Sequence, residues 1–116
     1  MQLEEFLDVL NSSPESISFE DCINVIKQHY DYRPSVFRNG AVNNAAGSNE
    51  GSCKIFAFAR LHSLSEQQTL ACFGHYYRDD VLRHPHGTNH ANIRQFIQTG
   101  WPGIQFERDD VLTPRK

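Results

Sequence analysis

Apolar residues recur at helical spacing in several stretches of the chain. In residues 3–10 they fall at positions i, i+3, i+4 and i+7, which is the spacing of one face of an α-helix: Leu3, Phe6, Leu7 and Leu10. Similar stripes lie in residues 19–30, 66–77 and 93–97. The pattern predicts amphipathic helices in all four stretches, with Gly100 ending the last of them.

Residues 51–62 are apolar on almost every side of a helix. Ile55, Phe56, Phe58, Ala59 and Leu61 leave nearly no polar face, and such a helix is normally buried. We therefore expect a mainly α fold, with about five helices packed around this central helix in a compact single domain. The 116 residues suit one domain spanning residues 1–116, and we expect the tail to be frayed from about residue 112.

Polar residues mark the expected starts of these helices. Ser18 with Asp21, and Ser65 with Gln68, have the spacing of a capping box. Thr88 or Asn89 is placed to cap the last helix, and Asn49 or Ser52 the central one.

One segment carries a turn signal instead of a helical stripe. "VFRNGAV" places an Asn-Gly step between apolar residues, which is typical of a β-hairpin. We expect a short hairpin near residues 36–42, with the strands at either side of the Asn39–Gly40 step.

Three stretches resemble the HopJ type III effector family of small bacterial proteins: "FRNG", "NNAAGSNEGSCKIFAFARLHSLSEQQTLACFGHYYRDDVL" and "GTNHANIRQFIQTGWPGI". The resemblance runs from about Phe6 to Val111. It implies a compact bacterial protein whose relatives include one named as a plant-pathogen effector. Because no activity is established for the family, it implies no catalytic residue. The expected location is the bacterial cytoplasm, and secretion through a type III system is implied by the resemblance alone.

The balance of charged residues indicates which classes of molecule the chain could bind. The chain has 11 basic and 14 acidic residues, a net charge of −3, and no basic block, so nucleic-acid binding has little electrostatic support. No apolar run approaches the roughly 20 residues of a membrane span. We therefore expect the partner, whose identity the sequence leaves open, to be a protein or a small polar ligand.

Cys53 is a candidate catalytic residue because it lies in the first turn of the expected central helix. The helix dipole favours a thiolate there, and a histidine such as His90 would supply the base of a hydrolase or transferase. The alternative is packing, since Cys53 directly precedes the most apolar stretch of the chain and buried cysteines are mostly inert. We expect Cys53 to be a packing residue.

The stretch "HPHGTNH" brings His84, His86 and His90 close together in the sequence. Imidazoles can bind zinc or nickel, so a metal-dependent enzyme is a third interpretation. The spacing matches no zinc motif, and surface histidines of a loop explain it more simply. We expect no metal and no cofactor.

Polar residues gather near two expected helix starts, and they are the candidate ligand-binding residues: Asn49, Glu50, Ser52, His90 and Arg94. Helix capping alone would also explain them. The sequence indicates a small binding or interaction protein without defined chemistry. An enzyme using Cys53 and a histidine is the alternative.

Overall fold

The computed structural model describes residues 1–115. Its five α-helices in that range are α1 (Leu3–Ser12), α2 (Phe19–His29), α3 (Glu50–Leu61), α4 (Glu66–Ala71) and α5 (Ala91–Thr99). Its short strands are β1 (Tyr30–Tyr32), β2 (Phe37–Asn39), β3 (Val42–Asn44), β4 (Ile104–Phe106) and β5 (Leu112–Pro114). Single turns of 3-10 helix occur at Pro14–Ser16 and Trp101–Gly103, and a π-helical turn at Tyr76–Val81. None of the helices in residues 1–115 combines the length and apolar character that a membrane span requires.

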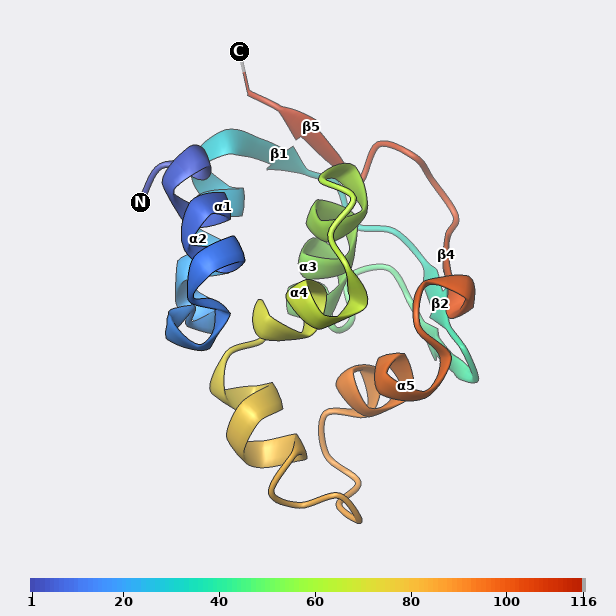
Figure 1. Cartoon of the computed structure of the whole chain (residues 1–116). Coiled ribbons are helices and arrows are strands. Elements are labelled where there is room, and N and C mark those ends of the chain that lie inside the picture. Colours follow the sequence, from blue (N-terminus) through green and yellow to red (C-terminus); the bar gives the residue numbers. More distant parts are fainter. Residues whose placement is uncertain (116) are drawn as a thin grey trace.

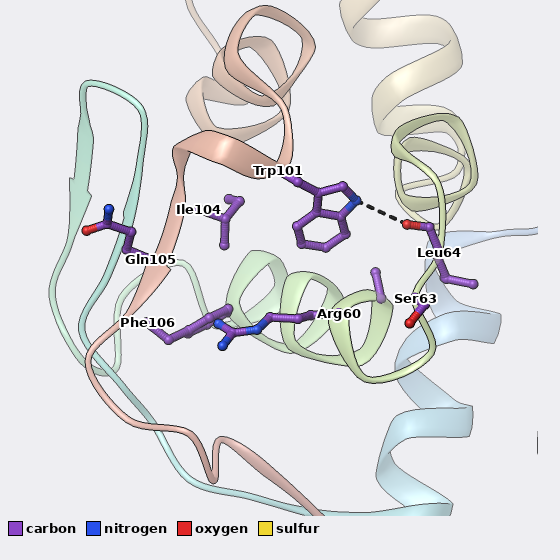
Figure 2. Close-up of a pocket in the computed structure, with 8 residues that line it drawn as sticks. Arg60, Ser63, Leu64, Trp101, Ile104, Gln105 and Phe106 are labelled. Carbon is purple, nitrogen blue, oxygen red and sulfur yellow. Dashed lines mark hydrogen bonds between the residues drawn. The ribbon is translucent and has the colours of Figure 1, made fainter.

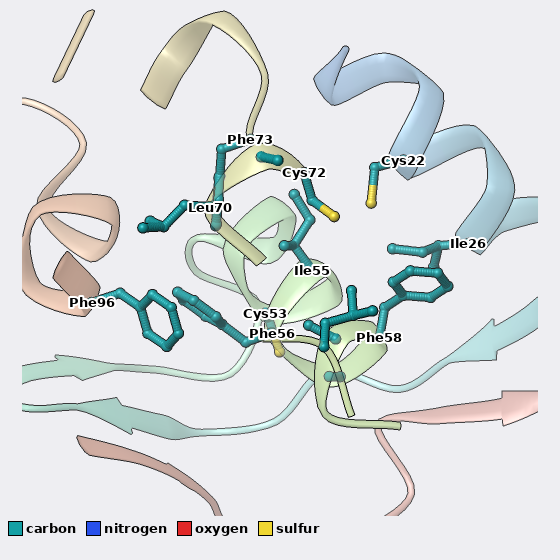
Figure 3. Packing of buried hydrophobic residues seen from close by; sticks show 14 of the residues in the cluster. Cys22, Ile26, Cys53, Ile55, Phe56, Phe58, Leu70, Cys72, Phe73 and Phe96 are labelled. Carbon is teal, nitrogen blue, oxygen red and sulfur yellow. The ribbon is translucent and has the colours of Figure 1, made fainter. Parts of the chain in front are cut away.

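Helix α3 is the centre of the core. Its residues from Ile55 to Ala59 are all buried, as is Cys53. Figure 3 shows Phe56 and Phe58 leaving α3 toward different parts of the core. The Phe56 ring centroid lies 5.0 Å from that of Phe96 in α5, and the Phe58 centroid lies 5.8 Å from that of Phe6 in α1. The expected buried central helix is confirmed.

The other elements cover α3 from two sides. Helices α1 and α2 lie together on one side, and α5 lies with strands β2 and β4 on the other (Figure 1). The capping boxes of Ser18 with Asp21 and of Ser65 with Gln68 both form, so α2 and α4 begin where the sequence predicts. Gly100 follows the end of α5, also as predicted.

The β-structure is larger than the single hairpin expected from the sequence. Strands β2 and β3 form that hairpin, with Gly40 and Ala41 as its loop and Gly40 at φ +56°. Strand β4 then pairs with the other edge of β2, which gives a three-stranded antiparallel sheet in the order β3-β2-β4. A separate antiparallel pair joins β1 to β5. The fold is therefore dominated by helices but is not purely α.

The expectation of a frayed tail from about residue 112 is wrong for the described part of the tail. Leu112–Pro114 forms β5, and its register pairs Tyr32 with Leu112. Leu112 is also buried against the core. Pairing with β1 supplies main-chain partners that the sequence pattern did not reveal. Lys116 lies outside the described residues.

Two expected helix caps do not form. Helix α5 begins after His90, not after Thr88 or Asn89, and α3 begins after Asn49. Both residues adopt left-handed backbone conformations, at φ +52° for Asn49 and +53° for His90. Neither helix start receives a side-chain cap, from Ser52 or from any other described residue. The Asn49 amide is turned away and donates instead to Asn44 Oδ1 at 2.8 Å.

A buried network of asparagines joins the sheet to α5. Asn92 Nδ2 donates to Asn44 Oδ1 at 2.9 Å, and Asn44 Nδ2 donates to Asn92 Oδ1 at 3.2 Å. Asn39 Nδ2 donates to the Asn92 carbonyl at 2.8 Å. All three side chains are at least 95% buried, with exposures of 0% for Asn39, 2% for Asn44 and 5% for Asn92. Buried amides need such partners, so Asn39 and Asn44 both depend on Asn92.

We predict that Asn44→Ala lowers the free energy of unfolding by about 2–3 kcal/mol, because it leaves buried amides of its partners unpaired. Urea denaturation measures the change. Asn43→Ala is the matched control: Asn43 is the preceding, exposed residue of β3, and we expect a change within about 0.5 kcal/mol. Equal stability of the two variants would contradict a structural role for the network.

Candidate functional site

The starts of α3 and α5 meet at a polar cleft of about 340 Å³, here called the His90 cleft. Its polar wall carries Asn49, Ser52 and His90, and its aromatic wall is formed by Phe19, Phe73 and Tyr76. Three of the candidate ligand-binding residues are thus brought together from two helix starts that are far apart in the sequence.

His90 is held in place within this cleft. Its Nε2 lies 3.0 Å from Asp80 Oδ2, and its ring centroid lies 5.1 Å from that of Tyr76. When Nε2 carries the proton it donates to the Asp80 carboxylate, and in the neutral ring Nδ1 is then an acceptor. The pair therefore fixes the orientation of the imidazole.

The other two candidate ligand residues do not line the His90 cleft. Glu50 Oε1 accepts a hydrogen bond from the Tyr32 hydroxyl at 3.1 Å. The Arg94 guanidinium donates to the carbonyls of Asn89 at 2.6 Å and His84 at 2.7 Å. Arg94 therefore holds the loop before α5 in place, and Glu50 and His90 do not face one common cleft.

Cys53 is embedded in the core, with 1% of its surface exposed. Burial raises the pKa of its thiol above the ordinary value of 9.0, although hydrogen bonding from Tyr32 acts in the opposite direction. The thiol therefore stays protonated at neutral pH, despite its place in the first turn of α3. No histidine forms a hydrogen bond with Cys53 in residues 1–115.

The two other candidate metal ligands lie apart from any cluster. His84 and His86 are exposed on the loop before α5, whereas His90 pairs with Asp80. Across residues 1–115, no three side chains of histidine, cysteine, aspartate or glutamate converge as a metal site would require.

A larger cleft, of about 720 Å³, lies at the other end of α3 and is here called the Trp101 cleft (Figure 2). Its apolar walls are Trp101, Ile104 and Phe106, from the turn and strand after α5. Arg60 and Ser63, at and just beyond the C-terminal end of α3, form the opposite wall with Leu64.

Trp101 is held in place through both its indole and its main chain. Its Nε1 donates to the Leu64 carbonyl at 3.1 Å, as Figure 2 shows. Its main-chain N–H donates to Glu66 Oε2 at 3.0 Å, and its ring meets Phe96 edge-on at 5.3 Å. Only part of the indole is covered, so the residue both packs on the core and forms a rigid wall of the cleft.

Arg60 supplies the charge of the Trp101 cleft. Its guanidinium carbon lies 5.7 Å from the centroid of the Phe106 ring, in a cation–π arrangement. In residues 1–115 no carboxylate comes within 4.0 Å of this guanidinium. A neighbouring hollow lined by Leu61, Arg108 and Asp109 shares Arg60 and Phe106 with the cleft.

Sequence reasoning did not identify the Trp101 cleft. The available signals were the single tryptophan in "GWPGIQF" and Arg60, the one charged residue in the otherwise apolar stretch of residues 55–61. Neither signal shows that residues 60 and 106 meet, because that contact depends on the pairing of β4 with β2.

We predict that iodoacetamide modifies Cys53 in the folded chain much more slowly than in the urea-unfolded chain at pH 7. The thiolate is the reactive form, and burial both blocks access and raises the pKa. The rate should therefore increase as the pH is raised through and above 9.0. Mass spectrometry of the labelled peptides measures it. Selective labelling of Cys53 at pH 7, faster than that of Cys22 and Cys72, would contradict this assignment.

Comparisons with known proteins agree with this architecture. The model of the HopJ type III effector protein family matches residues 3–111. A crystal structure of a protein of unknown function, VPA0580, superposes with a TM-score of 0.97 at 54% sequence identity, over 99% of this chain and 95% of that one. The search of curated proteins gave no match.

The family match covers most of the chain and includes both clefts. The resemblance of the sequence to this family is therefore confirmed, and the chain belongs to the HopJ type III effector protein family.

Proposed function

We propose that this protein is a non-catalytic binding protein that holds a segment of a protein partner in the Trp101 cleft. The observation that carries the proposal is that this cleft of about 720 Å³ combines a partly exposed indole with a cation that has no carboxylate partner within residues 1–115. Tryptophan and arginine are enriched among the residues that contribute most to binding at protein interfaces.

The rigidity of the cleft supports this role. Trp101 is held by two hydrogen bonds, and Arg60 is placed over the Phe106 ring. Side chains that are already ordered lose less conformational entropy on binding. The exposed Leu61, with 52% of its surface accessible, extends the apolar surface beside Arg60.

The positions of the candidate catalytic groups also favour binding over catalysis. A nucleophile and its base must lie within hydrogen-bond reach of one another. Cys53 is enclosed in the core with a raised pKa, whereas His90 lines a cleft that does not include Cys53. A hydrolase or transferase that uses Cys53 and His90 is therefore the less favoured alternative.

The family description adds a setting for this role. A type III effector is delivered by a bacterial secretion system, and the family of this chain carries that description. On this proposal the chain is such an effector, and it acts by occupying a partner instead of modifying it.

We predict that short random peptides displayed on messenger RNA and selected on the intact chain will include ligands of the Trp101 cleft. Because the chain has a single tryptophan, such peptides should change its intrinsic fluorescence directly. Trp101→Ala should weaken their binding at least about 30-fold, measured by anisotropy of labelled peptides.

Two further variants test the specificity of that result. Arg60→Glu changes an exposed side chain and should also weaken binding without a change in thermal unfolding. Leu82→Ala is the control, because Leu82 is 53% exposed and lines neither cleft. Failure to enrich any peptide, or unchanged binding by Trp101→Ala and Arg60→Glu, would contradict the proposal.

A small polar ligand in the His90 cleft is the second candidate function. The observation in its favour is that Asn49, Ser52 and the oriented His90 line one hollow beside three aromatic rings. Such a mixture of apolar walls and a few fixed polar groups is typical of small-molecule sites.

For this second candidate, we predict that thermal unfolding with free amino acids, sugars and nucleoside monophosphates will reveal at least one stabilising compound. Its effect should disappear in His90→Ala and persist in His86→Ala, since His86 is exposed outside the cleft. Stabilisation that survives His90→Ala, or no stabilisation by any compound, would contradict a ligand site there.

A further inference from the structure

One edge of strand β4 is unpaired, and it borders the Trp101 cleft. In the sheet order β3-β2-β4, strand β4 has a neighbour only on the β2 side. The cleft is lined by Ile104, Gln105 and Phe106, which are the residues of β4. Figure 2 shows Ile104 and Phe106 beside Trp101 and Arg60.

The hydrogen-bond pattern identifies which main-chain groups face away from β2. The Gly103 carbonyl accepts from the Gly40 N–H, and the Glu107 N–H donates to the Val36 carbonyl. Since main-chain groups of alternate residues point to opposite edges of a strand, Ile104 and Phe106 direct theirs to the free edge.

Three of these outward groups are available to a partner. The Ile104 N–H is already used, because it donates to the Trp101 carbonyl. The Ile104 carbonyl and both main-chain groups of Phe106 point away from β2, and outside the β2–β4 pairing they make no main-chain hydrogen bond within residues 1–115. In an antiparallel pair, one residue can exchange two hydrogen bonds with the residue opposite, and Phe106 retains both groups needed for this.

The cleft has the size and side-chain chemistry for an added strand. Its volume of about 720 Å³ holds about four extended residues at ordinary strand spacings. Ile104 and Phe106 present their side chains to the same face, as residues i and i+2 of a strand do. Two residues of an added strand would therefore face α3, one near Trp101 and one near Arg60.

From these features we propose that the Trp101 cleft binds its partner by β-strand addition, as an extended segment with an apolar and an acidic residue two positions apart. Main-chain bonds to Phe106 and Ile104 hold the segment along β4. The apolar side chain packs on Trp101 and the carboxylate pairs with Arg60. This proposal rests on the binding function proposed above and specifies the kind of segment that the cleft recognises.

The acidic residue follows from charge complementarity. The Arg60 guanidinium lies beside the cleft with no carboxylate within 4.0 Å in the described chain. A carboxylate on the partner would make a charge-assisted hydrogen bond with it. Arg38 donates to Gln105 Oε1 at 2.7 Å, and both residues lie on the opposite face of the sheet by strand alternation.

The test uses peptides selected on the intact chain, with two readouts. The enriched sequences should share an apolar and an acidic residue at i and i+2. A scan that methylates one backbone nitrogen at a time should weaken binding at least about tenfold at alternate positions of the central segment, because each affected N–H loses its acceptor on β4.

Arginine variants provide the matched comparison. Arg60→Gln should weaken binding at least about tenfold, the loss expected for a hydrogen bond to a charged group. Arg38→Gln, on the other face of the same sheet, should leave the affinity within about twofold. Replacing the acidic residue of the peptide by its amide should weaken binding to the unmodified chain as much as Arg60→Gln does. The same replacement should change binding to the Arg60→Gln variant little.

The outcomes separate this proposal from the function on which it rests. Two results would overturn strand addition but leave the binding function intact. In the first, peptides that depend on Trp101 tolerate methylation at every position. In the second, the selected peptides lack the acidic residue. A dimer that forms through β4 and excludes the peptides would show that a second copy of the chain is the occupant, and would also overturn it. If no peptide binds, both proposals are wrong.

Discussion

Helix α3 has almost no polar face, and the need to remove it from water determines where the other elements lie. Five consecutive residues from Ile55 to Ala59 are buried, so no single neighbour can cover the helix. Helices α1 and α2 shield one side, and α5 with the three-stranded sheet shields the other. Burial of this much apolar side-chain surface is the main source of stability in a domain of this size.

The two clefts lie at the two ends of α3, where the surrounding elements no longer cover the helix. The His90 cleft opens at the N-terminal end of α3, where Gly51 and Ser52 meet the start of α5. The Trp101 cleft opens at the C-terminal end, where Arg60 is exposed beside β4. The buried asparagines Asn44 and Asn92 link the sheet to α5, and Asn92 also lines the His90 cleft. The packing of the core and the geometry of the clefts therefore depend on the same elements.

Local signals in the sequence predicted much of the fold. The two capping boxes, the central helix and the hairpin depend on residues within a few positions of each other, and the structure contains all four. The pairs β1–β5 and β2–β4 could not be predicted in this way, because each strand has three residues and its partner lies far away in the chain. Short strands carry too little alternation to be distinguished from turns.

The candidate site, like the fold, could be predicted only where neighbouring residues in the sequence mark it. Asn49, Ser52 and His90 do line one cleft, since polar residues at two helix starts are a local signal. Glu50 and Arg94 face other partners, Tyr32 and the carbonyls of the loop before α5. The Trp101 cleft joins residues 60–64 to residues 101–106, and only the tertiary contact between α3 and β4 shows that these segments meet.

The most direct test of strand addition at the Trp101 cleft is a crystal structure of the intact chain with a selected peptide bound. We expect an extended peptide beside β4 that hydrogen-bonds to the main chain of Phe106 and places a carboxylate against Arg60. A peptide bound elsewhere, or one in the Trp101 cleft that makes no main-chain contact with β4, would contradict it.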